Sequence, residues 1–207
     1  MSGITVSKAR SIARQIAAID RRFEAVIKAA GPSTIGRIPS KSTNFQALAE
    51  SILSQQLSIK AADTITGRVK VLAGGAITPA RIARLSDRSL RSAGCSAAKS
   101  RALRELAAVS VNGDIPIRSL HTLSDEEIFK TLTPLFGIGR WTVEMFLIFQ
   151  LGRIDIWPVG DLGVRRGWEK IHNLSAEITP GELEKKGERF TPFRSHVAWY
   201  CWRALSL

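Results

Sequence analysis

The organisation of this chain follows from one short turn, Thr133-Pro134-Leu135-Phe136-Gly137-Ile138-Gly139-Arg140-Trp141-Thr142-Val143. Apolar side chains recur at helical spacing on both sides of it, at Ile128, Leu132 and Leu135 and then at Trp141, Met145, Ile148 and Phe149. Glycine between the two patterns allows positive φ and leaves amide N–H groups uncovered where the second helix begins. The sequence therefore predicts two helices joined by a tight turn whose amides point outward.

The turn admits three interpretations. The spacing of Gly137 and Gly139 is that of a dinucleotide-binding loop, but the third glycine position holds Thr142 and the preceding pattern is helical rather than a strand. A plain helix–helix connection is the simplest interpretation, because short connections are common. The third is a helix-hairpin-helix motif, in which the partial positive charge at a helix N-terminus binds a DNA phosphate.

The charge of the chain favours a polyanionic partner. The 207 residues include 30 Lys and Arg against 18 Asp and Glu, which gives a formal net charge of +12 and a pI near 10.5. Such an excess steers a protein toward nucleic acid and releases counterions on binding. A membrane surface is disfavoured because no long basic amphipathic stretch is present. A basic, solvated surface without a partner stays open.

The rest of the chain predicts an all-α fold. No run alternates apolar and polar residues as strands do, and helices are expected at 4–30, from Phe45 to Ser54, at 59–72, in one short helix leading to Leu90, at 97–109 and from Ser124 onward. Thr43 or Asn44 caps the second of these. Ser124 to Glu127 has the pattern of a capping box. The two cysteines, Cys95 and Cys201, are expected to be small core residues.

Three separated motifs resemble the helix-hairpin-helix-Gly/Pro/Asp DNA glycosylases, within them the 3-methyladenine DNA glycosylase II type. They are Leu135–Thr142 followed by Pro158 and Asp161, then Phe45–Leu48 through Ile52–Ser58, and finally Phe193–Arg203. The resemblance implies a two-lobed helical fold with the damaged base in the cleft between the lobes. One lobe is expected at about 1–40 plus 153–207, and the other, which carries the hairpin, at about 41–152.

Asp161 is the candidate catalytic residue. It lies between a non-helical segment, Pro158-Val159-Gly160, and a helix that is expected to begin at Leu162. The simplest interpretation is therefore that Asp161 is the N-cap of that helix. Breaking an N-glycosidic bond develops positive charge on the sugar, however, and a fixed carboxylate stabilises that charge. The family's catalytic aspartate falls on Asp161. Relatives often have a second acidic residue just before it, where this chain has Gly160.

Aromatic residues provide the candidate base pocket. Trp199 and Trp202 lie three apart on one helix, and either is expected in the core unless a base stacks on it. A flipped base needs flat apolar walls, and an indole face attracts an alkylated purine that carries positive charge. By resemblance the stacking tryptophan is Trp202, and Trp141 is a second wall. Bifunctional relatives have lysine at the position of Trp141, so the chain is expected to hydrolyse the bond without cleaving the strand.

Ser54-Gln55-Gln56-Leu57-Ser58 carries two adjacent amides in an apolar context. Their simplest role is to bond neighbouring backbone, because buried amides cost free energy when they are unpaired. By resemblance this turn is instead the wedge that fills the gap left by a flipped nucleotide. The sequence does not choose between Gln56 and Leu57 as the wedge.

The resemblance also implies how the backbone of double-stranded DNA is bound. Gly137, Ile138, Gly139 and Arg140 are expected to contact phosphates, and the backbone carbonyls of Thr133, Leu135 and Ile138 to hold a monovalent cation, Na⁺ or K⁺, that bridges to one of them. No cofactor is expected to be required. We expect a monomer that binds DNA with damaged bases, without membrane association, in the bacterial cytoplasm near the nucleoid or in a eukaryotic nucleus.

Two other function classes stay open. One is a helix-hairpin-helix DNA-binding protein without catalysis, against which Asp161 argues. The other is a glycosylase for oxidised, otherwise damaged or mismatched bases. Trp141 in place of lysine argues against it, and so do the two cysteines, which are too few for an iron–sulfur cluster.

Overall fold

The computed structural model describes residues 3–37 and 40–207, and in these residues all regular secondary structure is helical. The predicted all-α class is confirmed. None of the described helices is both long enough and apolar enough to cross a lipid bilayer. The chain forms two compact units, Met1–Ser40 with Leu147–Leu207, and Lys41–Phe146. The second boundary thus lies at 146/147, whereas the sequence analysis placed it at about 152/153.

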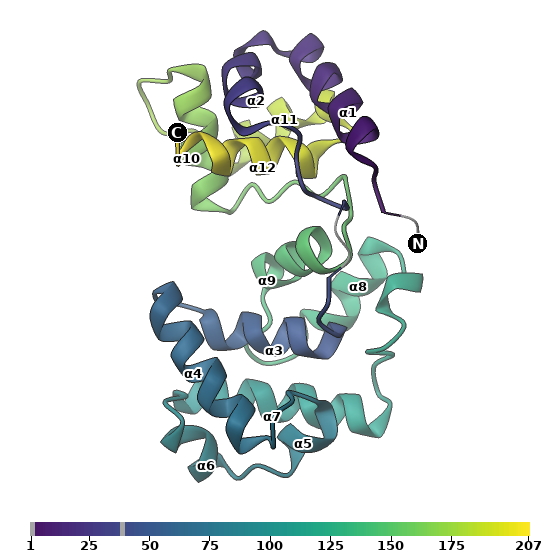
Figure 1. Ribbon diagram of the computed structural model, residues 1–207, viewed down its shortest axis with the longest axis vertical. Helices are drawn as coiled ribbons and strands as arrows, with labels where there is room; N and C mark the ends of the chain where they lie inside the picture. Colours follow the sequence, from purple (N-terminus) through teal and green to yellow (C-terminus); the bar gives the residue numbers. More distant parts are fainter. Residues whose placement is uncertain (1–2, 38–39) are drawn as a thin grey trace. The chain divides into compact units, whose positions relative to one another are not determined.

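The first unit is built around its last helix, α12. Its elements are α1 (Val6–Ile19), η1 (Arg21–Phe23), α2 (Glu24–Ala30), the π-helical turn η3 (Phe146–Gln150) from Leu147 onward, α10 (Leu162–His172), α11 (Pro180–Gly187), η4 (Glu188–Phe190) and α12 (Arg194–Ala204). α10, α2 and α1 pack against α12, as Figure 1 shows. Gly167 permits the closest approach, because a Cβ there would lie 2.0 Å from the carbonyl oxygen of Cys201.

The second unit is organised around α7. Its elements are α3 (Asn44–Ser54), α4 (Ile59–Leu72), α5 (Pro79–Ala83), α6 (Asp87–Ser92), α7 (Ala97–Asn112), η2 (Leu120–Thr122), α8 (Asp125–Leu132) and α9 (Arg140–Met145). α3, α5 and α6 pack on α7, which buries Leu103 and Leu106. α8 and α9 are the two helices that flank the glycine-containing turn (Figure 1).

The helix caps agree with the local sequence. Ser124 and Glu127 form the predicted capping box at the start of α8. Thr43, rather than Asn44, caps α3 by accepting a hydrogen bond from the Gln46 amide at 3.2 Å. The Asn44 side chain instead donates to the carbonyl of Ile117.

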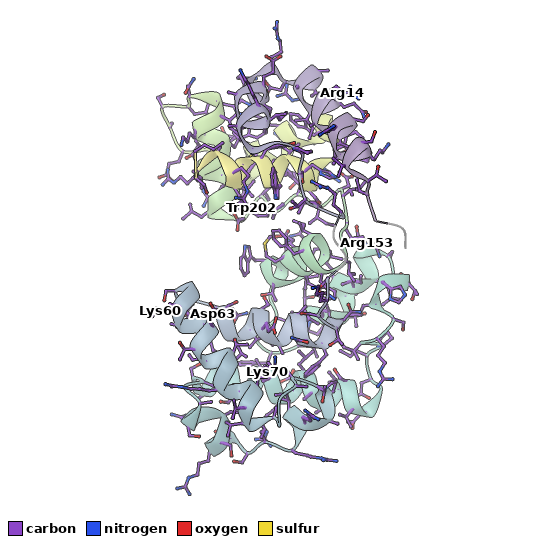
Figure 2. All side chains as sticks on the ribbon, viewed as in Figure 1. Arg14, Lys60, Asp63, Lys70, Arg153 and Trp202 are labelled. Atoms are coloured by element: carbon purple, nitrogen blue, oxygen red, sulfur yellow. The ribbon has the colours of Figure 1, made fainter. Side chains whose placement is uncertain are left out.

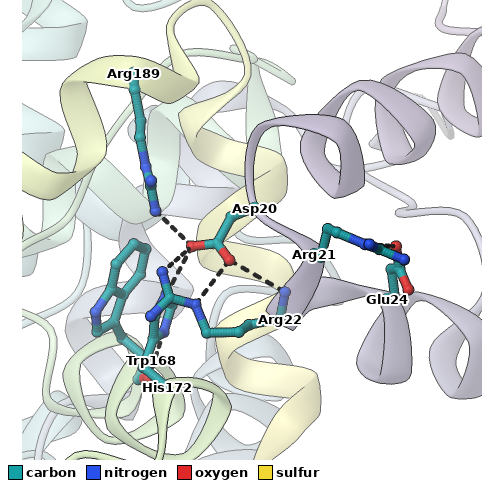
Figure 3. A network of polar contacts seen from close by, with 7 residues as sticks. All are labelled: Asp20, Arg21, Arg22, Glu24, Trp168, His172 and Arg189. Carbon is teal, nitrogen blue, oxygen red and sulfur yellow. Dashed lines mark hydrogen bonds and ion pairs between the residues drawn. The ribbon is translucent and has the colours of Figure 1, made fainter.

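The single helix predicted over 4–30 is wrong. Asp20 is extended (φ −149°, ψ 105°) and separates α1 from η1, while its carboxylate caps the amide of Arg22. The same carboxylate accepts hydrogen bonds from the side chains of Arg22, His172 and Arg189 (Figure 3). Long-range partners help to hold this break, and the apolar spacing of the sequence continues across it, so the capping aspartate is the one local sign of it.

Two further predictions need correction. The one short helix expected before Leu90 is two, α5 and α6, because Ser86 leaves the helix and caps the second. The apolar face expected after the turn is also wrong in part. Trp141 and Phe149 are 45% and 53% exposed, and the π-helical turn that follows α9 buries Phe146 and Leu147 instead.

Candidate active site

Asp161 lies at the N-terminus of α10, as its sequence context predicts. Its Oδ1 accepts a hydrogen bond from the amide of Val164 at 2.8 Å, and the indole Nε1 of Trp202 donates to the same oxygen at 2.8 Å. Two donors on one oxygen fix the direction of the carboxylate. The structure thus brings together two of the predicted site residues, which are 41 positions apart in the sequence.

The indole of Trp202 is also part of an aromatic pair. Trp202 projects from α12 (Figure 2) and is partly exposed, and its ring centroid lies 5.4 Å from that of Phe149 at an interplanar angle of 33°. Sequence reasoning counted Phe149 among the apolar residues of a helix and missed this role. A π-helical turn inside a helix is often found at a functional site, and here it presents Phe149 outward.

Gly163 gives the indole access to the carboxylate. A Cβ at this position would lie 2.9 Å from Cδ1 of Trp202 and 3.1 Å from Oδ1 of Asp161. The first distance is shorter than real Cβ contacts and the second is tighter than most of them, so a side chain here would displace the indole and crowd the carboxylate. Sequence reasoning missed Gly163, because only the packed structure shows what it faces.

The segment before Asp161 is fastened to the start of α12. The amide of Ser195 donates to the carbonyl of Ile154 at 3.0 Å, and its hydroxyl accepts from the amide of Ile156 at 2.8 Å. Arg194 forms a two-pronged ion pair with Asp155, at 2.8 and 2.9 Å, and this contact raises the pKa of the guanidinium. The helix that carries Trp202 therefore also anchors the chain that leads to Asp161.

The far end of α10 is held by the Asp20 cluster (Figure 3). His172 stacks on Trp168 at 3.9 Å and bonds the Asp20 carboxylate through Nε2 at 3.0 Å. Burial alone would raise the pKa of Asp20, but the hydrogen bonds from Arg22 and His172 hold it well below its usual range. Burial lowers the pKa of His172. The helix that begins at Asp161 is thus anchored at both ends.

Trp199 and Cys201 are core residues. Trp199 is 7% exposed and packs edge-to-face on Tyr200 with ring centroids 5.1 Å apart. Cys201 is buried, and burial, followed by the nearby charge of Asp161, raises the pKa of its thiol well above the usual value. The two tryptophans of α12 therefore differ in role, although they are three residues apart.

In the second unit, the turn between α8 and α9 is tightly built. The amide of Leu135 donates to the carbonyl of Leu132, and that of Ile138 to the carbonyl of Leu135, both at 3.1 Å. Gly137 has φ +79°, and a Cβ there would lie 2.8 Å from the Cβ of Ala102 on α7. Glycine is therefore required twice at this position, for its backbone conformation and for the contact with α7.

The turn offers exposed donors to a phosphate. Gly137 and Gly139 are exposed, and within the described part of the chain no acceptor bonds their amides. The amide of Phe136 differs, because the Glu105 carboxylate accepts from it at 2.9 Å. Arg140 forms an ion pair with Glu144 at 2.9 Å but keeps an exposed guanidinium. Trp141, on α9 in this same unit, is exposed and so is not a core residue.

The candidate wedge is a tight turn at the end of α3. The amide of Leu57 donates to the carbonyl of Ser54 at 3.2 Å, and Gln56 has a positive φ of 56°. Gln56 is exposed and Leu57 is 39% exposed, so both project from the turn and the choice between them stays open. Gln55 instead donates to the carbonyl of Gly137, 82 positions away, and not to the neighbouring backbone that the sequence analysis gave as the simplest partner for these amides.

Comparison with known proteins gives the family. Residues 49–193 match the HhH-GPD superfamily of base excision DNA repair proteins. The chain belongs to the HhH-GPD superfamily. It is 35% identical to DNA-3-methyladenine glycosylase 1 of Schizosaccharomyces pombe over 195 residues, which are 93% of this chain and 86% of that protein.

Solved structures agree with this assignment. The S. pombe 3-methyladenine DNA glycosylase in complex with abasic DNA matches with a TM-score of 0.86 at 34% identity, over 95% of this chain and 97% of that one. A DNA-3-methyladenine glycosidase from Bacillus halodurans matches with a TM-score of 0.82 at 36% identity, over 93% and 88%. The HhH-GPD match spans the turn and Asp161 but ends before Trp202, so the contact between Trp202 and Asp161 is an observation of this structure.

The cation site expected for this HhH-GPD chain can be tested against the donors present. The carbonyl of Leu135 accepts one hydrogen bond, from Ile138, and a carbonyl oxygen has two lone pairs, so it retains capacity for a ligand. The three sites are backbone carbonyl oxygens of Thr133, Leu135 and Ile138, and backbone carbonyl oxygens are the ligands that replace the hydration shell of K⁺ in channel filters. Among the described residues, no group of three or more His, Cys, Asp or Glu side chains is placed so that it could hold a metal ion.

Proposed function

We propose that this HhH-GPD protein is a monofunctional DNA glycosylase that releases alkylated purines of the 3-methyladenine and 7-methylguanine type. One observation carries the proposal. The Asp161 carboxylate is aimed by two hydrogen bonds at Oδ1, and one of its donors is the indole of the partly exposed aromatic pair Trp202–Phe149. An oriented anion beside flat aromatic surfaces suits a cationic base on a sugar that becomes positively charged.

The reaction breaks the bond between C1′ of the sugar and the purine nitrogen. As this bond lengthens, positive charge moves from the alkylated base to the sugar, and the base leaves as a neutral molecule. Asp161 stabilises the positive sugar, and water then adds to C1′ and loses a proton, which leaves an abasic site. A base that is already cationic needs little acid assistance, so one carboxylate suffices.

Trp141 supports hydrolysis without strand cleavage. Bifunctional relatives use a lysine amine at this position to attack C1′ and form a Schiff base. An indole has no basic amine, so Trp141 cannot take that role. We infer that the product is an intact strand with an abasic site, and that Trp141 instead offers an exposed aromatic surface.

The hairpin supports binding to double-stranded DNA. The exposed amides of Gly137 and Gly139 are available to a phosphate at the positive end of α9, and Arg140 follows them in the sequence. The net charge of the chain, +12, also favours DNA. We place the wedge at Gln56 or Leu57 and the monovalent cation on the carbonyls of Thr133, Leu135 and Ile138. We further propose that the protein is a monomer, that it requires no cofactor and that it acts in the compartment that holds the genome.

The test is to incubate the protein with methylated duplex DNA and to identify released bases by mass spectrometry. We expect 3-methyladenine and 7-methylguanine in solution, and strand breaks only after alkali. The exposed Gln15→Glu variant on α1 is a control for preparation and charge. Release of no base would support a DNA-binding protein without catalysis, release only of oxidised or mismatched bases would support the other alternative, and strand breaks before alkali would contradict a monofunctional reaction.

A further inference from the structure

The turn after α3 is a type II β-turn with an unfavourable residue in it. Gln55 has φ −51° and ψ 131°, Gln56 has φ +56°, and the Leu57 amide donates to the Ser54 carbonyl. The third position of such a turn normally holds glycine or asparagine, because it requires positive φ. Glutamine at this position is strained, and strain of this kind persists only where the surroundings hold it in place.

Gln55 provides that support from within the same unit. Its Nε2 donates to the carbonyl of Gly137 at 2.9 Å and lies 3.3 Å from the hydroxyl of Thr142. Gly137 is the middle of the glycine-containing turn, and Thr142 is 2% exposed in the first turn of α9. One side-chain amide therefore ties the end of α3 to the turn and to the second helix of the hairpin, 82 and 87 positions away.

α7 supports both partners of this contact. Lys99 on α7 donates through Nζ to the carbonyl of Leu53 at 2.7 Å, and so holds the last turn of α3. Ala102, one helical turn further along α7, contacts the position of Gly137 so closely that a Cβ there would lie 2.8 Å away. The wedge turn and the hairpin thus rest on one helix, and Gln55 is the direct link between them.

We propose that Gln55 is a positioning residue that couples the phosphate-binding hairpin to the wedge. The inference rests on the proposed function, because it takes the hairpin and the Ser54–Leu57 turn as the two DNA-contacting parts. A side chain pushed into a base stack meets resistance and must be held from behind. Gln55 provides this hold by joining the turn to the element that is fixed on the DNA backbone.

The test uses a substitution of nearly equal shape. Gln55→Glu replaces the amide donor by a carboxylate that faces the carbonyl of Gly137, so attraction becomes repulsion. Thr142→Val removes only the weaker of the two contacts. Gln15→Glu makes the same charge change at an exposed site on α1 and is the matched control. Each variant is compared with the wild type in melting temperature and in affinity for undamaged duplex.

Two readouts report on the wedge. Fluorescence of 2-aminopurine next to 7-methylguanine in a duplex reports stack disruption without requiring base release. Single-turnover release of 7-methylguanine reports the whole reaction. Relative to Gln15→Glu, we expect Gln55→Glu to lower both signals by at least ~10-fold and Thr142→Val by about 2- to 3-fold, as expected from the loss of one hydrogen bond or part of one. Affinity for undamaged duplex should stay within about twofold.

Each result of these measurements either supports or overturns the proposed coupling. Signals equal to those of Gln15→Glu would overturn it, as would a parallel loss of melting temperature and duplex affinity, which indicates a merely structural contact. A wild type without any 2-aminopurine response would overturn it too. A wild type that releases no base but disrupts the stack in a Gln55-dependent way would instead contradict the catalytic proposal and support the coupling.

Discussion

Trp202 combines an observed hydrogen bond with the base-stacking role proposed for it, and substitutions can separate the two. Its indole N–H donates to the Asp161 carboxylate at 2.8 Å, while its ring, paired with Phe149, is the candidate surface for a cationic base. Trp202→Phe keeps an aromatic ring and removes the donor. Trp202→Leu removes both the donor and the aromatic quadrupole. The two variants should therefore lose activity in different ways.

The magnitudes follow from the two interactions. A hydrogen bond to a charged group contributes about 1.5–3 kcal/mol, so Trp202→Phe should slow release of every substrate by roughly 10- to 160-fold. The Val164 amide still orients Asp161, which favours the lower end of that range. Loss of the cation–π contact in Trp202→Leu costs about 0.5–2 kcal/mol more, a further factor of roughly 2 to 30, on cationic bases alone.

The assay is kcat/KM on 7-methylguanine, which is cationic, divided by kcat/KM on neutral hypoxanthine. This ratio should change little in Trp202→Phe and fall in Trp202→Leu. Trp199→Leu, a core substitution on the same helix, should lower the melting temperature and leave the ratio unchanged. A wild-type rate in Trp202→Phe would refute the role of the N–H donor, and an unchanged ratio in Trp202→Leu would refute cation–π selectivity.

Four further outcomes are expected. Asp161→Asn should retain duplex affinity, measured by anisotropy, and slow single-turnover release of 7-methylguanine by at least ~10²-fold; a near wild-type rate would remove Asp161 from the mechanism. Affinity for undamaged duplex should fall with salt at a log–log slope of about −0.9 per phosphate contacted, whereas a flat response would argue against DNA. Gly167→Ala should abolish or strongly destabilise folding in a thermal melt, because the added Cβ would lie 2.0 Å from the Cys201 carbonyl, and a wild-type melting temperature would contradict that packing. Burial lowers the pKa of His196 to about 4, so below pH 6.5 the unfolded chain binds more protons than the folded one. The free energy of unfolding should therefore fall by roughly 3 kcal/mol between pH 6.5 and pH 4. His196→Leu should flatten this part of the stability profile measured with denaturant, and an equally steep profile would contradict the assignment.

Local signals explain what the sequence could predict. Thr43, Ser124 and Asp161 each begin a helix with a side chain that caps the first turn, and a cap depends only on residues three positions apart. The sequence also predicted the glycine-containing turn, because the positive φ at Gly137 is a local requirement. The helical class and the position of the candidate carboxylate follow from such features.

The remaining features depend on partners far away in the sequence. The break at Asp20 is held by His172 and Arg189, and the Gln55 contact is made with a turn 82 positions on. Phe149 gave a false signal, because an apolar residue in an apolar run predicts burial and only the π-helical turn directs it outward. Spacing alone could not identify these residues, since their roles are set by packing.

Three carboxylates of the first unit differ in the groups that donate hydrogen bonds to them. Asp155 is bonded by the Arg194 guanidinium, and Asp20 by Arg22 and Arg189, so ion pairs within the fold offset much of their charge. The two donors at Oδ1 of Asp161 are a backbone N–H and an indole N–H, both neutral. Donors at fixed positions hold a carboxylate in one direction, and an oriented carboxylate is what stabilising a positive sugar requires. The Trp202 indole thus orients the Asp161 carboxylate while its ring lies beside Phe149, and this pairing is the basis of the role proposed for Asp161.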